Sequence, residues 1–277
     1  MNRRILSVIA LSSCLLGATL QAGVVENLVN AFWKKEETAP ATIKILVLHD
    51  KPGAVLEVKG KYKIFDPHTN AFISTRFIGK RKFIQALNSS LKWGEEFPGV
   101  HQLKIVPDDA ATTTLVDGIE YKGDLYIYDV GGTISIVNEI PLDDYLKIVL
   151  NPLFDNALPE EVAAAIAIAA RGNAWYQVQN PKSEYFTVDA AKIGYRGYAA
   201  GFKRNGIDSA ILETKNMILT KNSDPFPNNF TGTTPAANPE NSEISLEQAV
   251  KLAQKGDHAA EILQKAYPGS KVSLINQ

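Results

Sequence analysis

The sequence predicts an α+β fold: a strand-rich N-terminal part, a central buried alanine-rich helix, a β-hairpin and closing C-terminal helices. Short β-rich runs broken by turn residues follow one another over residues 43–118, a spacing typical of a meander or sandwich. Residues 159–177 are rich in alanine, and two amphipathic segments close the chain, which indicates helices after the strands. Strands grouped before helices favour the α+β class.

Residues 1–22 have the features of a signal peptide. Arg3 and Arg4 give a positive start, and residues 5–20 form an uncharged apolar stretch, which is short for a membrane span. Ala22 then offers a small-residue cleavage site. We therefore expect an exported protein of the periplasm or cell envelope.

Cys14, the single cysteine of the chain, lies inside this segment. Residues 11–14 loosely resemble a lipoprotein signal, and a lipid on Cys14 would then anchor the chain to a membrane. The apolar run continues past Cys14, which favours an ordinary signal-peptide residue instead. Cleavage after Ala22 would leave a chain with no thiol and no disulfide.

Turn residues divide the rest of the chain into segments. Residues 23–42 are expected to be a linker, because their second half is polar and holds a proline. A β-rich subdomain is predicted at 43–118 and a second region, the core, at 119–277. Within the predicted β-rich subdomain, the expected strands are residues 43–49, 54–60, 62–67 and 71–79.

A hairpin is predicted around Gly131 and Gly132. Apolar residues alternate on both sides of this pair, and two glycines accept the positive φ angles of a tight turn. Pro141 should end the second strand, because proline has no N–H for the ladder. Residues 141–150 are then expected to form a short helix or turn.

The strongest helix signal begins at Pro159. Proline suits a first-turn position, and Glu160 and Glu161 beside it complement the helix dipole. The alanines that follow allow close packing, so we expect this helix to be buried. A surface loop is predicted near 222–243, and a helix pair is predicted beyond it with Gly256 as the stop between its two helices.

Composition excludes several classes of function. The net charge is −1, from 29 basic and 30 acidic residues without a basic stripe, so no nucleic-acid partner is expected. No phosphate-binding loop, dinucleotide fingerprint or nucleophile elbow is present, so no cofactor is expected. The histidines lack metal-ligand spacing, and no metal site is expected; they are His49, His68, His101 and His258.

Three segments in the same order resemble the stage II sporulation protein D / LytB (amidase-enhancer) family, which acts on bacterial peptidoglycan. They are residues 136–149, 159–171 and 252–272, and the likeness extends over about residues 43–275. The matched positions of the first two segments are Asn138, Pro141, Asp144, Tyr145, Leu146, Glu161, Ala165, Ala169, Ala170 and Arg171. The resemblance implies a peptidoglycan glycan strand as the bound partner, with a cell-wall amidase or division proteins as further partners.

The resemblance also implies a catalytic glutamate that this chain lacks. Without gaps, the glutamate position falls on Leu153. Three other positions of the family pattern differ here, and they are Ala164, Ile166 and Gly194. Leucine cannot transfer a proton, and general acid catalysis contributes about 10²–10⁴-fold to a rate.

The resemblance leaves two interpretations of the catalytic position. Either the acid is lost and the protein binds glycan or assists an amidase, or a relocated carboxylate keeps lytic transglycosylase activity. Asp155 and Asp144 are the candidate acids, although turn formation and helix capping explain them more simply. A scaffold that kept only the fold is a third, weaker alternative.

The resemblance places Arg171, Tyr195 and Tyr145 as candidate substrate-binding residues. Arg171 and Tyr195 also have structural explanations. A buried arginine needs a partner, so Arg171 could instead pair with a helix-entry carboxylate such as Asp144. Tyr195 could stack on a sugar ring or fill the edge of the core.

Overall fold

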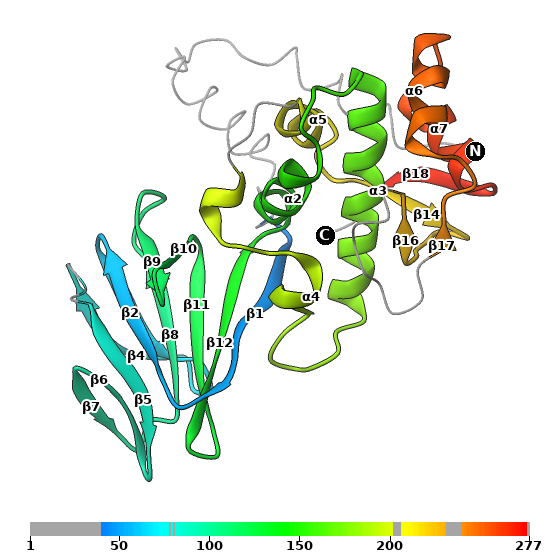
Figure 1. Ribbon diagram of the computed structural model, residues 1–277. Helices are drawn as coiled ribbons and strands as arrows, with labels where there is room; N and C mark the ends of the chain where they lie inside the picture. Colours follow the sequence, from blue (N-terminus) through cyan, green and yellow to red (C-terminus); the bar gives the residue numbers. More distant parts are fainter. Residues whose placement is uncertain (1–39, 78, 80, 202–205, 231–239, 276–277) are drawn as a thin grey trace, which may run out of the picture. The chain divides into compact units, whose positions relative to one another are not determined.

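The protein adopts an α+β fold in the computed structural model shown in Figure 1, which confirms the predicted class. The described residues are 40–77, 79, 81–201, 206–230 and 240–275. They belong to one structural unit, Pro40–Gln277. The predicted signal peptide, Cys14 and all but the last three residues of the predicted linker lie outside the described residues.

Two sheets make up the strand-rich part of the described chain. The strands of the first sheet, in order, are β13 (Val188–Asp189), β1 (Thr42–Lys51), β12 (Thr133–Pro141), β11 (Asp124–Val130), β8 (Gln102–Pro107), β3 (Tyr62–Asp66) and β4 (Ala71–Arg76). Those of the second sheet are β10 (Ile119–Tyr121), β9 (Thr113–Val116), β2 (Ala54–Lys59), β5 (Lys82–Leu87), β6 (Ser90–Trp93) and β7 (Glu95–Pro98). Apolar residues of both sheets share one buried cluster, so the sheets pack face to face as in a sandwich.

Alternation along the strands places one face of each in this core. Ile127 of β11 pairs with Ile136 of β12, and neither side chain is exposed. Their sequence neighbours point to the opposite face, because successive side chains of a strand alternate. Tyr126 and Tyr128 are therefore on the outer face of the first sheet.

The first strand joins segments that are far apart in the sequence. β1 pairs antiparallel with β12, from Thr42 opposite Pro141 onwards. On its other side β1 pairs in parallel with β13, where Ile45 lies opposite Val188. One strand thus connects the hairpin to the region that follows the main helix.

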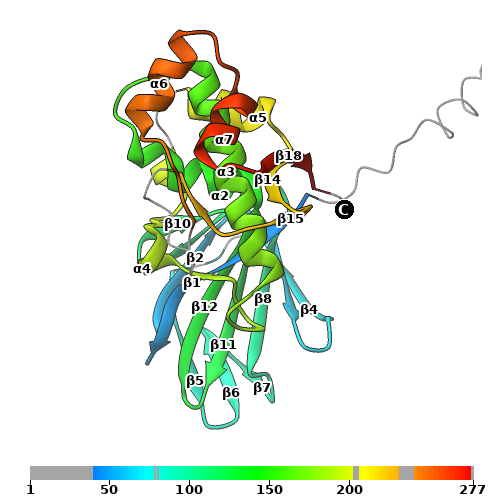
Figure 2. The same ribbon diagram turned by 90° about the vertical axis from the view of Figure 1, so that its right-hand side faces the viewer.

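The predicted hairpin is confirmed. Val130 pairs with Thr133 across a turn in which Gly131 and Gly132 have φ angles of 66° and 94°. β12 ends at Pro141, as predicted, and leads directly into α2 (Leu142–Leu150). Figure 2 shows β11 and β12 rising from this turn towards the helices.

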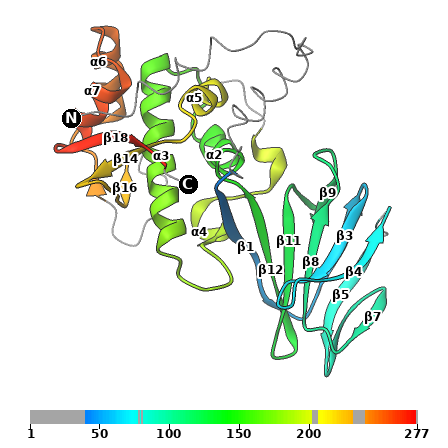
Figure 3. The ribbon, with the colours of Figure 1, turned by 180° about the vertical axis from the view of Figure 1, so that it is seen from behind.

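The alanine-rich helix α3 (Glu160–Gln179) lies at the centre of the helical part. In Figures 1 and 3 it stands between α2 and α5 (Ile207–Glu213) on one side and α6 (Leu246–Gln254) and α7 (Ala259–Ala266) on the other. Small residues let its neighbours approach closely. A Cβ added at Gly172 would lie 2.9 Å from the backbone nitrogen of Leu219 in β14 (Met217–Lys221).

The C-terminal elements cover the opposite side of α3. The predicted helix pair is present as α6 (Leu246–Gln254) and α7 (Ala259–Ala266), with Gly256 between them at a φ of 99°. The short strands of this region are β14, β15 (Asp224–Pro225), β16 (Asn228–Asn229), β17 (Glu240–Asn241) and β18 (Ser270–Leu274). The predicted loop contains β15, β16 and β17, and its residues 231–239 lie outside the described part.

A search of the described residues for a membrane-crossing helix found none that combines the required length and apolar character.

Candidate functional site

Arg171 is a structural centre of the helical part. Its side chain is 1% exposed, and its Nε donates to Asp143 Oδ1 at 3.0 Å, an ion pair between α3 and α2. Its terminal nitrogens donate to the carbonyl oxygens of Ile211, Thr214 and Met217 at 2.8, 2.7 and 3.0 Å. Burial lowers the pKa of Arg171 and Asp143 opposes this effect, while the guanidinium stays charged. Arg171 therefore ties α2, α3, α5 and β14 together.

Asp144 does not fill either of the structural roles expected for it. The carboxylate that pairs with Arg171 is Asp143. The prediction that Asp144 could be this partner is therefore wrong. Asp144 makes no capping bond, because the start of α2 after Pro141 has no side-chain cap. Its half-exposed carboxylate instead accepts a hydrogen bond from Lys147 at 3.0 Å, one turn along the helix.

Tyr145 and Tyr195 belong to a buried aromatic row. Tyr195 lies between Tyr121 and Tyr145, at ring-centroid distances of 6.0 and 6.4 Å. The hydroxyl of Tyr195 donates to Asn138 Oδ1 at 2.6 Å. The exposed fractions are 5% for Tyr195 and 0% for Tyr145, and burial raises the pKa of both phenols. A ligand on the surface would reach little of either ring, so direct binding would need the surface to open.

The position assigned to the catalytic glutamate lies on the surface. Leu153 ends the 3₁₀ turn η1 (Asn151–Leu153) after α2, and its side chain is 41% exposed. Asp155, two residues later, is also exposed. Asn151 connects this turn to α5, because its buried Nδ2 donates to Asp208 Oδ1 at 2.8 Å. An apolar side chain is therefore presented to solvent where the resemblance implies an acid.

The other three altered positions lie on other elements, two of them on α3 and one directly after α4 (Ala190–Ile193). Ile166 is 1% exposed in the core of α3, and Ala164 is half-buried. Gly194 ends α4 with a φ of 70°, the left-handed conformation that favours glycine. A glutamine there would be strained. The backbone conformation at position 194 thus explains by itself why this residue is a glycine.

Glu161 joins two helices that are far apart in the sequence. Its Oε2 accepts the backbone N–H of Ala259 at 2.7 Å, at the start of α7, and its Oε1 lies 3.0 Å from His258 Nδ1. These contacts lower the pKa of Glu161 and raise the pKa of His258. Glu161 was predicted only to interact with the dipole of α3 in its first turn. It also connects the start of α3 to the start of α7.

The outer face of the first sheet holds a pocket that the motif comparison did not indicate. We call it the sheet-face pocket; its volume is about 290 Å³. Its aromatic walls are Tyr128, Tyr185 and Phe186, with Tyr185 edge-on to Tyr128 at 4.9 Å. The remaining lining residues are Leu46, His49, Gln102, Asp129, Val130, Ser135 and Val137. The signal available in the sequence was the pair Tyr126 and Tyr128, which share one strand face.

A second pocket of about 280 Å³ continues from this one. It shares Leu46, His49 and Phe186 with the sheet-face pocket. Its further polar lining residues are Gln177, Lys182, Asp189 and Lys192. Aromatic surfaces with polar groups at the rim are the usual composition of a small-molecule site.

Charged groups flank the aromatic face on its other side. Lys44 and Lys104 lie over the ring of Tyr126 at 4.7 and 5.0 Å from its centroid, within cation–π distance. The hydroxyl of Tyr126 donates to Glu139 Oε2 at 2.6 Å. Burial raises the pKa of Glu139, but hydrogen bonds from Tyr126 and Thr42 outweigh it and hold the pKa below its ordinary value.

No group of three or more histidine, cysteine, aspartate or glutamate side chains in the described residues is placed to hold a metal ion. Of the four histidines, His101 contacts Asp129 at 2.8 Å and His258 contacts Glu161.

Comparison with known proteins identifies a family match in the segment that contains most of these residues. The family described as stage II sporulation protein (SpoIID) matches residues 130–220. This range includes the hairpin turn, α2, α3 and the 3₁₀ turn that carries Leu153.

Relatives extend the similarity to most of the chain. An uncharacterized protein of Chlamydia muridarum is 30% identical over 241 residues, which cover 84% of this chain and 77% of the relative. One from Chlamydia pneumoniae is 30% identical over 194 residues, 69% of this chain and 70% of its own length. A protein of Brachyspira hyodysenteriae is 29% identical over 64% of this chain and 47% of its own length. No solved structure matches significantly.

Proposed function

The chain belongs to the stage II sporulation protein (SpoIID) family, and on this premise we propose that it is a peptidoglycan-associated protein without catalytic activity. It binds glycan strands, or assists a cell-wall amidase in wall remodelling. The observation that carries this proposal is Leu153. An exposed leucine occupies the position where the resemblance implies the acid, and no hydrocarbon side chain can protonate a glycosidic oxygen.

Neither of the two candidates for a relocated acid, Asp155 and Asp144, has suitable surroundings. A general acid at a glycosidic bond needs a carboxyl group held protonated by apolar neighbours. Asp155 is exposed to solvent, and Asp144 is half-exposed and paired with Lys147. Both therefore lack the water-excluded environment that supports proton transfer.

Glycan binding is supported by the sheet-face pocket. Sugar rings present apolar C–H faces that pack on aromatic side chains, and Tyr128 and Tyr185 offer such surfaces. Asp129, Gln102 and His49 at the rim can hydrogen-bond to hydroxyl groups. Under this proposal Arg171, Tyr145 and Tyr195 hold the surface in place from inside and do not themselves contact the glycan.

The proposed location is the cell envelope. It is supported by the basic start and apolar stretch of residues 1–22. Immunoblotting of periplasmic, membrane and cytoplasmic fractions tests this, with Cys14→Ala as a variant. Loss of the membrane fraction in this variant would indicate a lipid anchor.

The main test incubates residues 23–277 with peptide-stripped glycan strands and with insoluble sacculi. We expect sedimentation with sacculi and no anhydro-muramyl product in the mass spectrum. Tyr185→Ala should weaken binding by about 3- to 10-fold, the value of one aromatic contact. Phe72→Ala removes another exposed aromatic side chain, on β4, and should bind as the wild type.

The alternative of a relocated acid has a distinct outcome. Anhydro-muramyl products that disappear in Asp155→Asn or Asp144→Asn, but persist in the exposed control Asp224→Asn, would establish lytic activity and refute the proposal. Absence of both binding and cleavage would leave a scaffold.

A further inference from the structure

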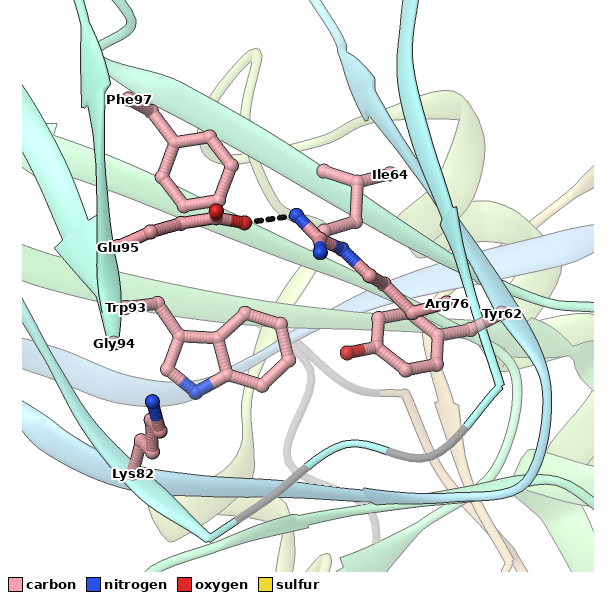
Figure 4. A pocket seen from close by; sticks show the side chains of 8 residues that line it. All are labelled: Tyr62, Ile64, Arg76, Lys82, Trp93, Gly94, Glu95 and Phe97. Atoms are coloured by element: carbon pink, nitrogen blue, oxygen red, sulfur yellow. Dashed lines mark hydrogen bonds and ion pairs between the residues drawn. The ribbon is translucent and has the colours of Figure 1, made fainter.

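A pocket at one edge of the strand sandwich has no part in the proposed function. We call it the edge pocket; its volume is about 310 Å³, within the range of small-molecule sites. Figure 4 shows its lining, which is Tyr62, Ile64, Arg76, Lys82, Trp93, Gly94, Glu95 and Phe97. It lies where β4 ends the first sheet and β7 ends the second.

Strand register explains why polar side chains face inwards here. On the first sheet Tyr62 pairs directly with Arg76, so their side chains share one face. On the second sheet Ile84 pairs with Trp93, and Lys82 lies two residues before Ile84 on the same face. Two basic side chains therefore enter the space between the sheets.

Unused hydrogen-bond donors converge in the edge pocket. Trp93 is 7% exposed, and its Nε1–H has no hydrogen-bond partner in the described residues. Figure 4 shows this nitrogen on the side of the ring that faces Lys82 Nζ. Among the described residues, no ion pair or hydrogen bond is found for the ammonium group of Lys82 or for the hydroxyl of Tyr62, which also line the pocket. A buried donor without a partner has lost its hydrogen bonds to water without compensation, which destabilises the protein until a ligand supplies an acceptor.

The lining of the edge pocket has fewer hydrogen-bond acceptors than donors. Glu95 is the one carboxylate of the lining, and it is already paired with Arg76. Burial raises the pKa of Tyr62, which keeps the phenol protonated as a donor. The lining thus carries two cations against one anion, so it is complementary to a ligand that brings negatively charged acceptor oxygens.

The walls also offer flat apolar surface. The rings of Tyr62 and Trp93 lie 5.9 Å apart at an angle of 43°, and Ile64 and Phe97 line the same space. Gly94 keeps room for the lysine, since a Cβ there would lie 2.3 Å from Lys82 Cδ. A ligand with an apolar or planar body would pack on these walls.

We infer that the edge pocket binds a small organic anion. Its oxyanion group accepts hydrogen bonds from Trp93 Nε1 and Lys82 and is attracted by Arg76, while its apolar body lies against the aromatic rings. Carboxylates and phosphate monoesters share this chemistry. The rival explanation is that inward-pointing charges merely protect two edge strands from pairing with other chains.

Spectroscopy of the indole N–H group gives a direct test. The chain has three tryptophans, so ¹H–¹⁵N spectra of residues 23–277 show few indole peaks, and Trp93→Phe identifies the peak of Trp93. Sodium benzoate and phenyl phosphate serve as probes for the two kinds of anion. We expect at least one to shift this peak with saturation, and neutral benzyl alcohol to leave it in place.

Substitutions separate a built site from edge protection. Lys82→Met should weaken binding about tenfold, because a charge-assisted hydrogen bond is lost, and should reduce its salt dependence. Lys92→Met is the matched control, since Lys92 is exposed on the neighbouring strand β6. Lys82→Met remains informative if Trp93→Phe does not fold. No shift with either anion, or equal affinity in Lys82→Met and the wild type, would refute the inference.

Discussion

Arg171 shows how one side chain can serve four elements. It is buried on α3, pairs with Asp143 and donates to three carbonyl oxygens beyond α3. Replacement by methionine keeps most of the volume but leaves a carboxylate and three carbonyls without their donor. Breaking a buried pair from one side costs about 3–5 kcal/mol.

We therefore expect Arg171→Met to lower the free energy of unfolding by about 3–5 kcal/mol in urea titrations. Arg171→Lys should not restore it, because an ammonium cannot reproduce the planar fork of donors. Lys251→Met, which breaks an exposed pair with Glu247, should change the value by about 0.5 kcal/mol or less. A small effect of Arg171→Met would contradict the structural role.

At the scale of elements, we expect the contact between α3 and α7 to depend on pH. The pKa of His258 is raised above its ordinary 6.5 by Glu161, with smaller effects of Glu261 and Asp257. Its contribution to stability is complete below about pH 6.5 and is lost as the pH rises through the raised pKa. The pKa of Glu161 is lowered from 4.5, so its contribution is lost as the pH falls through that lower value.

We expect this contact to be strongest between about pH 4.5 and 6.5. His258→Gln should remove the decline in unfolding free energy that the wild type shows above pH 6.5. The measurement is urea denaturation at a series of pH values. His68→Gln, on the exposed turn between β3 and β4, should keep the wild-type slope; parallel curves for wild type and His258→Gln would contradict the assignment.

The packing of α3 on β14 permits a second prediction at this scale. Gly172→Ala gains about 1 kcal/mol of helix propensity. Its Cβ, however, would lie 2.9 and 3.1 Å from the backbone nitrogen and oxygen of Leu219, and backbone atoms cannot rotate away. Overpacking costs about 1–3 kcal/mol, so it outweighs the gain.

We expect Gly172→Ala to lower the melting temperature, observed by circular dichroism. Gln179→Ala tests helix propensity without the clash, because Gln179 is exposed at the end of α3, and it should be neutral or stabilising. A raised melting temperature in Gly172→Ala would show that α3 and β14 separate easily.

At the scale of the whole molecule, the two predicted segments share one sheet. β1, β3, β4 and β8 precede residue 119, whereas β11, β12 and β13 follow it. A fragment of residues 119–277 would leave both outer edges of the β11–β12 hairpin unpaired and expose Ile127 and Ile136. We expect this fragment to aggregate or to show poorly dispersed NMR spectra, whereas residues 40–277 fold. A dispersed spectrum of the shorter fragment would contradict this.

Local patterns predicted the elements that depend on local chemistry. The glycine pair of the β11–β12 turn, the proline directly before α3 and Gly256 between α6 and α7 each act within a few residues. The parallel pairing of β1 with β13 could not be predicted, because nothing near Ile45 encodes its distance to Val188.

The candidate site was predictable to a smaller extent for the same reason. Motif positions such as Asn138, Tyr145 and Tyr195 were found, but their mutual contacts belong to the tertiary structure. The sequence predicted that a carboxylate at the start of a helix could pair with Arg171, but not that this carboxylate is Asp143. Lys82 and Arg76 gave no signal, since charged residues in strands ordinarily alternate towards solvent.

The double pairing of β1 has a consequence for the order of folding. Thr42–Lys51 is early in the chain, yet its two neighbours, β12 and β13, end at residues 141 and 189. Long-range pairing requires large loops to close and slows folding. A chain emerging from its N-terminus therefore carries β1 without either neighbour until about half of its length is available, and with one edge unpaired until about two thirds is available. The interval during which β1 keeps an unpaired edge is set by the position of β13, its last partner strand.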